Sequence, residues 1–353
     1  MLSDGRCLDI PLEKTTCLQC GIAAHARPLT VASIRDVYGD DYALASASPL
    51  ADAARARAYA DALTRLVTPH RRILEIGCGS GALLRELHGR WLDASLTGLD
   101  PAVPESAGNG ARIRYKRGFF EAFGEEKEEF DLIFSVNVIE HVADPGEFFA
   151  RAAALLAPGG QMVFFCPTSE PPNLELLFHD HLHTFTPAAL ERLARAVGMT
   201  MQIQENRVEG LGDFQFISFV QSTRTVAQLS NVDPIKLAQQ RTDYLLAWRN
   251  LEKILHARIG AVDRVALFGA GQMAALLRAY APTLWERVDM LVMDNPGDAW
   301  SLDKPVRAYA DVRDTLQDAV MVIATAPGAQ GFVANRLVAD GLKTVRFDDL
   351  ISS

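Results

Sequence analysis

At 353 residues, the chain is long for one compact domain, and its length favours two or three domains. Hydrophobic residues make up 49% of the sequence and charged residues 22%, the balance of a globular protein with buried cores. The formal net charge of -9 argues against a nucleic-acid-binding protein, because phosphate binding needs clustered Lys and Arg.

Hydropathy and the cysteines give an expectation about the cell compartment. No apolar run approaches the ~20 residues that span a bilayer. The N-terminus lacks the basic region and apolar stretch of a signal peptide, and the five cysteines form no regular disulfide framework. We therefore expect a cytoplasmic protein with no membrane partner, and the oligomeric state stays open.

The chain separates by pattern into residues 1–50, 51–222 and 223–353. The first region is rich in loops and contains a Cys-x-x-Cys sequence at Cys17 and Cys20. A structural zinc needs four ligands, usually from two such knuckles, and here one knuckle is complete. Cys17, Cys20 and Cys7 are therefore the candidate zinc ligands, with His25 as a further candidate. A degenerate knuckle without metal is the alternative.

The second region alternates helical stretches with short apolar strands. A helix is expected over residues 51–67, stopped by Pro69. The expected strands are residues 72–76, 94–100, 130–136 and 161–166. Strands that alternate with helices predict an α/β fold with a parallel sheet covered on both faces.

The glycine-rich turn between the first of these strands and the next helix contains Gly77, Gly79 and Gly81. Glycine allows backbone torsions forbidden to other residues and lets a ligand approach the main chain. Asp100 ends the following strand, where a carboxylate can accept both ribose hydroxyls of a nucleoside. Dinucleotide sites and methyltransferase sites share these features, so the turn alone leaves both open.

Four motifs in order resemble those of class I S-adenosylmethionine-dependent methyltransferases, over roughly residues 55 to 220. They are Glu75–Gly81, Gly98–Asp100, Glu140–Pro145 and Leu156–Gly160. The resemblance implies a Rossmann-like sheet that binds S-adenosylmethionine through a defined set of residues. That set comprises Glu75, Gly77, Cys78, Gly79 and Gly81 at the methionine part, Asp100 at the ribose, Phe119 at the adenine, and Asn137 and Val138 at the sulfonium. Glu140 and His141 are expected to brace the loop.

The order of three regions is similar to that of nucleotide-sugar C-methyltransferases. Those proteins have a zinc-ribbon segment, which the sequence around Cys17 and Tyr38–Tyr42 resembles, then a methyltransferase domain and a Rossmann-like domain. The segment Phe178–His183 resembles their Tyr-His-Glu-His sequence, and the resemblance implies catalytic roles for His179, Asp180 and His181. A base there can remove the proton next to a sugar ketone, and imidazole titrates near neutrality. Alternatively, Thr186 simply caps the next helix and the histidines are structural.

The third region predicts a second, smaller Rossmann-like unit. Its expected strands are residues 264–268, 288–293 and 319–324. Gly269 and Gly271, with Asp294 further on, form a fair dinucleotide fingerprint and leave an NAD-binding enzyme or sensor open. The resemblance implies instead a domain that closes over a nucleotide-sugar without redox chemistry.

Taken together, the sequence favours methyl transfer to a carbon or oxygen of a small polar substrate, with a nucleotide-linked sugar as the expected acceptor. A methyltransferase that acts on a different small molecule, and a binding module without activity, also fit the sequence.

Overall fold

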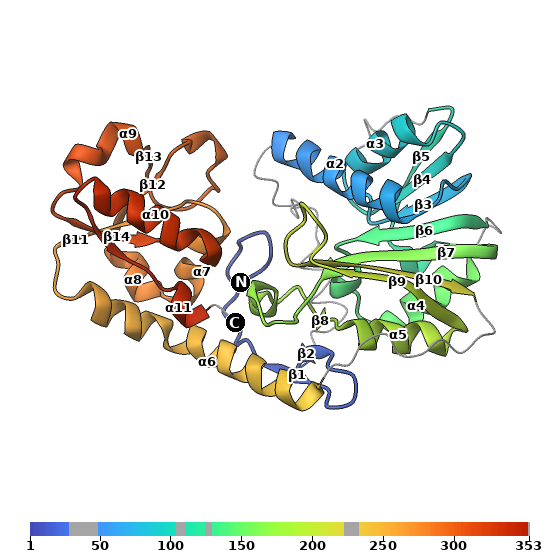
Figure 1. Ribbon diagram of the computed structural model, residues 1–353, viewed down its shortest axis with the longest axis horizontal. Helices are drawn as coiled ribbons and strands as arrows, with labels where there is room; N and C mark the ends of the chain where they lie inside the picture. The colour runs from blue at the N-terminus through green and yellow to red at the C-terminus, as the bar shows by residue number, and fades with distance from the viewer. Residues whose placement is uncertain (28–48, 104–109, 124–128, 222–232, 352–353) are drawn as a thin grey trace. The chain divides into compact units, whose positions relative to one another are not determined.

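The computed structural model describes residues 1–27, 49–103, 110–123, 129–221 and 233–351. These residues form two compact units (Figure 1). Pro11–Ala238 form the large unit, and Met1–Ile10 together with Gln239–Ser353 form the small unit. The Tyr38–Tyr42 motif lies outside the described residues.

The large unit is built on a seven-stranded sheet of order β5-β4-β3-β6-β7-β10-β9. The first five strands in this order run parallel, and β10 pairs antiparallel with both β7 and β9. The strands are β3 (Arg72–Ile76), β4 (Ser95–Asp100), β5 (Ile113–Arg117), β6 (Phe130–Val136), β7 (Leu156–Pro167), β9 (Met199–Asn206) and β10 (Phe214–Gln221). The antiparallel edge differs from the wholly parallel sheet that the sequence predicts.

Helices cover both faces of this sheet. Helix α2 (Pro49–Leu66) and α3 (Ala82–Arg90) pack over one face, where Leu63 and Leu84 join the core. Helix α4 (Pro145–Ala154) and α5 (Pro187–Ala196) pack over the other, where Phe149 and Leu190 are buried. Figure 1 shows the two helix pairs on opposite sides of the strands. Short 3-10 turns connect the elements: η1 (Phe120–Ala122), η2 (Ile139–His141) and η3 (Leu174–Leu177).

A second, three-stranded sheet in the large unit joins its N-terminal segment to a distant part of the chain. Strands β1 (Lys14–Thr16) and β2 (Ala23–His25) form a hairpin, and β2 also pairs with β8 (His183–Thr184). We call residues 14–25 the N-terminal hairpin. This pairing ties the hairpin to the segment that contains His179 and His181.

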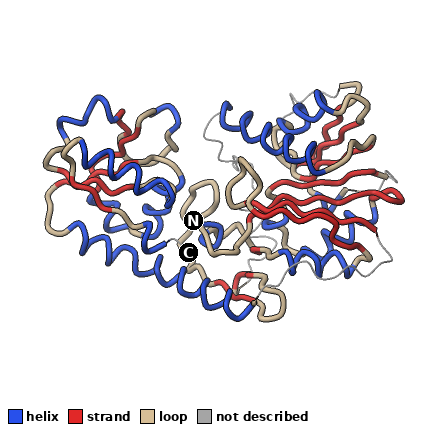
Figure 2. The backbone as a smooth tube through the Cα atoms, viewed as in Figure 1, coloured by secondary structure: helices blue, strands red, loops and turns tan. Residues whose placement is uncertain are grey.

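The small unit contains a five-stranded parallel sheet of order β13-β12-β11-β14-β15. Its strands are β11 (Arg264–Phe268), β12 (Val288–Met293), β13 (Val306–Ala308), β14 (Ala319–Ile323) and β15 (Lys343–Val345). Its helices are α6 (Pro234–Ile259), which begins in the large unit, α7 (Gln272–Tyr280), α8 (Pro282–Arg287), α9 (Tyr309–Val312), α10 (Pro327–Ala339) and α11 (Asp348–Ile351), with turns η4 (Pro296–Asp298) and η5 (Arg313–Thr315). Figure 2 shows helices flanking the strands of each unit.

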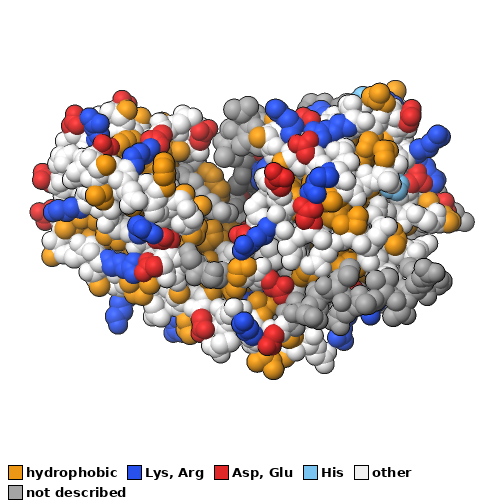
Figure 3. Space-filling model, viewed as in Figure 1, with side chains coloured by type: hydrophobic (Ala, Val, Ile, Leu, Met, Phe, Trp, Pro, Cys, Tyr) orange, Lys and Arg blue, Asp and Glu red, His pale blue; other side chains and the backbone are white. Residues whose placement is uncertain are grey.

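The predicted fold class is thus confirmed: a Rossmann-like α/β sheet and a second, smaller parallel sheet. On the face that Figure 3 shows, side chains of Lys and Arg are interspersed with those of Asp and Glu over both units. Among the described residues, no helix is both long enough and apolar enough to cross a bilayer.

Candidate active site

The glycine turn between β3 and α3 has the geometry that its three glycines allow. Gly77, Gly79 and Gly81 have φ values of 76°, 50° and 74°, the left-handed region that favours glycine. A Cβ atom on Gly77 would stand 2.2 Å from Cγ2 of Val138, the second residue after β6. The turn therefore needs glycine at this position for both torsion and space.

Asp100 holds the turn from the end of β4. The backbone N–H of Gly79 donates to Oδ2 of Asp100 at 2.9 Å, and the N–H of Ala102 donates to Oδ1 at 2.7 Å. The N–H of Gly77 donates to the carbonyl of Leu99 at 2.7 Å. The structure thus brings Asp100 against the glycine turn, and its role at the ribose stays a prediction.

Glu75 lies beneath the turn, inside the sheet. Its side chain is buried, and Oε2 has no hydrogen-bond partner among the described residues. Burial, and then the neighbouring carboxylate of Asp100, raises the pKa of Glu75 well above its ordinary value. A buried acceptor with spare capacity suits an ammonium group. The residues of the turn therefore fit the amino acid part of S-adenosylmethionine.

The side chain of Cys78 packs inside the large unit. Its thiol is buried, and burial raises its pKa. A Cβ atom on Gly98 would stand 2.7 Å from Sγ of Cys78 and 2.6 Å from Leu84 Cδ1. The side chain of Cys78 fills the space between β4 and α3, so its backbone is the part that can face a ligand.

Phe119 and Asn137 lie at the ends of two further strands of the sheet. Phe119 follows β5 and Gly118 and is 42% exposed. Asn137 follows β6 with a φ of 55°, which asparagine tolerates better than most residues. Its Oδ1 is buried and has no hydrogen-bond partner in the described part of the chain. Both side chains thus keep surface or hydrogen-bonding capacity that a ligand can use.

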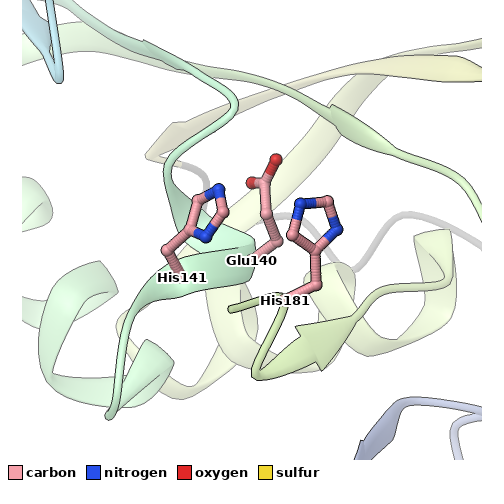
Figure 4. A group of neighbouring side chains, drawn as sticks. All are labelled: Glu140, His141 and His181. Atoms are coloured by element: carbon pink, nitrogen blue, oxygen red, sulfur yellow. The ribbon is translucent and has the colours of Figure 1, made fainter. Parts of the chain in front are cut away.

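A buried acid–imidazole cluster lies just beyond β6 and β7. Its members are Glu140 and His141 from η2 and His181 from the segment after η3. Figure 4 shows the Glu140 carboxylate between the two imidazole rings. The rings themselves meet edge to face, with centroids 4.7 Å apart. The sequence assigned Glu140 and His141 to bracing the loop and His181 to catalysis, and the structure brings all three together.

The titratable groups in this cluster shift one another's pKa values. Burial raises the pKa of Glu140 to about 8, although His181 opposes the shift. Burial and His181 lower the pKa of His141. For His181, burial acts downward, but the carboxylates of Glu175, Asp180 and Glu140 prevail and raise its pKa. Nδ1 of His181 lies 3.0 Å from Oε2 of Glu175, at ion-pair distance.

His179 has different surroundings from His181, whereas the Asp180 carboxylate lies at the edge of the cluster, with Oδ2 3.9 Å from Nδ1 of His141. The ring of His179 stacks on that of His25, with centroids 6.0 Å apart, and the His25 ring donates to the His179 carbonyl at 2.8 Å. Asp180 is buried, and its carbonyl accepts from Nδ1 of His141 at 2.8 Å. Of the three predicted catalytic residues, only His181 belongs to the cluster drawn in Figure 4. Their catalytic assignment stays a prediction.

Lys14 and Glu175 both contact His181, and neither of them was identified from the sequence. The ammonium of Lys14, in the N-terminal hairpin, donates to the carbonyls of Phe178 and His181. Burial lowers the pKa of Lys14 to about 7, and the charge of Asp180 opposes the shift. Lys14 lies 167 residues from His181 in sequence, so no local pattern could mark it, and Glu175 belongs to no motif that the sequence analysis used.

The Cys-x-x-Cys sequence forms the turn of the N-terminal hairpin. The N–H of Gly21 donates to the carbonyl of Cys17 at 2.9 Å, and Cys17 is exposed while Cys20 is half-buried. Cys7 belongs to the small unit, where Arg278 contacts its sulfur at 3.9 Å. In the described part of the large unit, the two thiols have no third cysteine, histidine or carboxylate ligand beside them. The described residues do not supply the four ligands of a structural zinc, and zinc binding here stays a prediction.

Thr186 caps α5, in keeping with the structural reading of this segment. Its hydroxyl accepts from the N–H of Ala189 at 3.1 Å and donates to the carbonyl of Cys20 at 2.6 Å. The cap therefore also fastens the N-terminal hairpin.

Two residues of the dinucleotide fingerprint in the small unit, Gly269 and Asp294, contact other parts of the same unit. Gly269 has a φ of 123°, and a Cβ atom there would stand 2.2 Å from the carbonyl oxygen of Ala324. Both carboxylate oxygens of Asp294 accept from Arg336, at 2.9 and 3.1 Å. Arg336 would have to release Asp294 before that carboxylate could bind a ribose.

Comparison with known proteins identifies the middle of the chain. Residues 51–203 match the family model described as a methyltransferase domain. The "Ubiquinone biosynthesis O-methyltransferase" of Azorhizobium caulinodans is 40% identical over 99 residues, which cover 26% of this chain and 38% of that protein. The protein of the same name from Caulobacter sp. is 41% identical over 99 residues, covering 26% and 39%. The chain thus spans about two fifths of the length of these curated relatives.

Among solved structures, the chain is similar to the 1,6-didemethyltoxoflavin-N1-methyltransferase of Burkholderia thailandensis. The identity is 22% and the TM-score 0.42, over 60% of this chain and 100% of that one. An S-adenosylmethionine-dependent methyltransferase from Mesorhizobium loti is 20% identical, with a TM-score of 0.39, over 46% and 97%.

Proposed function

We propose, from the premise that residues 51–203 are a class I methyltransferase domain, that the chain transfers a methyl group from S-adenosylmethionine to a small polar substrate. The observation that carries the proposal is the glycine turn, fixed by Asp100 on one side and Val138 on the other. The acceptor atom is a carbon or an oxygen, and we propose a nucleotide-linked sugar as the substrate.

The residues of the turn divide the work of holding the cofactor. The turn glycines and Glu75 receive the amino acid part, Asp100 the ribose hydroxyls and Phe119 the adenine face. S-adenosylmethionine supplies a methyl group on a positively charged sulfur that leaves readily. The chain's main contribution is therefore to position the acceptor atom in line with that methyl group.

We propose that the His181 imidazole accepts the proton that the acceptor loses. The proton leaves the carbon next to a ketone, or a hydroxyl, and the electron pair that remains forms the bond to the methyl group. Glu175 lies 3.0 Å from Nδ1 of His181 and stabilises the ring when it is charged. Lys14 supports this arrangement by holding the His181 carbonyl.

A panel of nucleotide-linked keto-sugars, incubated with the protein and methyl-labelled S-adenosylmethionine, tests the proposal. We expect label in at least one sugar and its loss in His181→Asn, while His88→Asn on α3 retains activity. Label in no member of the panel would remove the sugar assignment. An absence of cofactor binding by calorimetry would remove methyl transfer itself.

A second acceptor class is favoured by the curated relatives. Two of them carry the name ubiquinone biosynthesis O-methyltransferase and share up to 41% identity with this chain over 99 residues. A hydroxyl of a ubiquinone precursor is therefore the acceptor to include in the same panel. Label in that compound alone would assign the chain to oxygen methylation of a non-sugar substrate.

A further inference from the structure

Glu140 is a buried carboxylate that no other described residue satisfies with a hydrogen bond. Its side chain is 2% exposed, and neither Oε1 nor Oε2 has a hydrogen-bond partner among the described residues. A buried polar group left in this state costs free energy unless something binds it. Both oxygens of the Glu140 carboxylate are therefore available to a ligand that the protein does not itself supply.

Each of the two imidazoles beside Glu140 has an acceptor near its Nδ1 atom, at hydrogen-bond distance for His141 and at ion-pair distance for His181. Nδ1 of His141 contacts the Asp180 carbonyl at 2.8 Å, and Nδ1 of His181 lies 3.0 Å from the Glu175 carboxylate. Figure 4 shows each ring turning its other nitrogen toward the Glu140 carboxylate. A histidine that ligates a metal has this arrangement, with one nitrogen held by a carbonyl or carboxylate and the other directed at the ion.

We propose that Glu140, His141 and His181 bind a divalent transition-metal ion. One ligand atom from each residue lies within 4.8 Å of the others. Two imidazoles and one carboxylate are a known ligand set for catalytic zinc and for other first-row ions. Ligands of one zinc ion lie about 3.4 Å apart when the bonds are about 2.1 Å long, so binding closes the cluster by roughly an ångström.

Acidic side chains gather at the cluster. Besides Glu140, the carboxylate of Glu175 lies 3.0 Å from Nδ1 of His181, and that of Asp180 lies 3.9 Å from Nδ1 of His141. A divalent ion bound to Glu140 therefore has two further carboxylates close to its imidazole ligands.

The role of the ion rests on the proposed function. Three protein ligands leave at least one coordination position for an oxygen atom of the substrate. An ion that binds this oxygen lowers the pKa of a hydroxyl, or polarises a ketone, and so favours loss of the acceptor's proton. With the ion bound, His181 is a metal ligand and no longer the proton acceptor, and the proton passes to water instead. The acceptor is accordingly a substrate that presents a hydroxyl or keto oxygen beside the methylated atom.

Cobalt titration of the metal-stripped protein tests the site apart from catalysis. The background is Cys17→Ser/Cys20→Ser, because thiolates are good ligands for such ions and the N-terminal hairpin carries an exposed Cys17 and a half-buried Cys20. We expect one Co²⁺ per chain, with visible absorption that lacks thiolate bands. Glu140→Gln and His181→Asn, each checked for a native circular dichroism spectrum, should weaken Co²⁺ binding at least 10-fold. Glu147→Gln, on an exposed part of α4, is the matched control.

Equal Co²⁺ affinity in the background protein, Glu140→Gln and His181→Asn would overturn the metal site, as would no binding in the background. Methyl transfer is then measured with and without a chelator. Activity that survives the chelator while Co²⁺ fails to bind leaves the proposed function standing without the metal. Tight Co²⁺ binding without transfer to any acceptor counts against the proposed function and not against the metal site.

Discussion

Val138 lies so close to Gly77 that a single added methyl group would collide with it, since a Cβ atom on Gly77 would stand 2.2 Å from Val138 Cγ2. This contact joins the strand that carries the glycine turn to the segment that carries Glu140. The two halves of the site are therefore mechanically connected through one side chain.

Gly77→Ala is expected to destabilise the large unit by more than backbone strain alone. Alanine at a positive φ costs about 1 kcal/mol, and the collision with Val138 adds to that cost. Gly159→Ala is the matched control, because Gly159 has a φ of 77° with nothing within 4 Å of its Cβ position. Urea unfolding of both variants measures the difference. The double variant Gly77→Ala/Val138→Ala should return to the level of the control; if it does not, the contact with Val138 is not the cause.

Asp100→Ala is expected to weaken S-adenosylmethionine binding by about 10- to 100-fold. Hydrogen bonds to a charged group contribute about 1.5–3 kcal/mol, and the variant also releases the N–H of Gly79. Isothermal titration calorimetry gives the dissociation constant directly. Asp93→Ala, on an exposed turn before β4, should bind as the unaltered protein does. Equal affinities in the two variants would show that Asp100 does not contact the cofactor.

The sequence could predict the features that depend on neighbouring residues. Apolar runs ending in glycine marked β3 and its turn, and the carboxyl ends of adjacent parallel strands necessarily brought Asp100 beside that turn. The expected strand over residues 161–166 lies within a longer β7 that starts at Leu156. Periodicity misses that extension because Pro158, Gly159 and Gly160 are typical of a loop.

The acid–imidazole cluster depended on tertiary contacts instead. Glu140 and His181 come from different segments, and nothing in either segment specifies which way its side chains face. Lys14 is 164 residues from Phe178, whose carbonyl it binds, so tertiary contacts such as the pairing of β2 with β8 bring them together. A local sequence pattern therefore cannot predict that the Lys14 ammonium is buried.

The large unit is expected to lose stability as the pH falls below about 6.5, in part through His25. Burial, and then the charge of Lys14, lowers the pKa of His25 to about 4. Between that value and its ordinary pKa the unfolded chain binds a proton that the folded chain does not, so stability rises with pH in this window and is complete above it. The contribution is at most about 1.4 kcal/mol per pH unit.

Unfolding of the protein and of His25→Gln from pH 7 to pH 4.5 isolates this contribution, because the other titrating groups are common to both. Glutamine can still donate to the His179 carbonyl. We expect a shallower loss of stability in the variant, and parallel curves would show that His25 titrates normally in the fold.

Lys14→Met should loosen the segment that carries His181 while the cofactor still binds. Methionine keeps most of the side-chain volume but leaves the carbonyls of Phe178 and His181 without their donor, at a cost of about 1–3 kcal/mol for buried acceptors. Hydrogen exchange across residues 178–184 should accelerate. The turnover number for methyl transfer should fall, and the affinity for S-adenosylmethionine should stay, because the glycine turn makes none of these contacts. Lys236→Met, exposed on α6, is the control for loss of a positive charge. If hydrogen exchange and turnover are both unchanged in Lys14→Met, the N-terminal hairpin packs against the segment that carries His181 without positioning that segment.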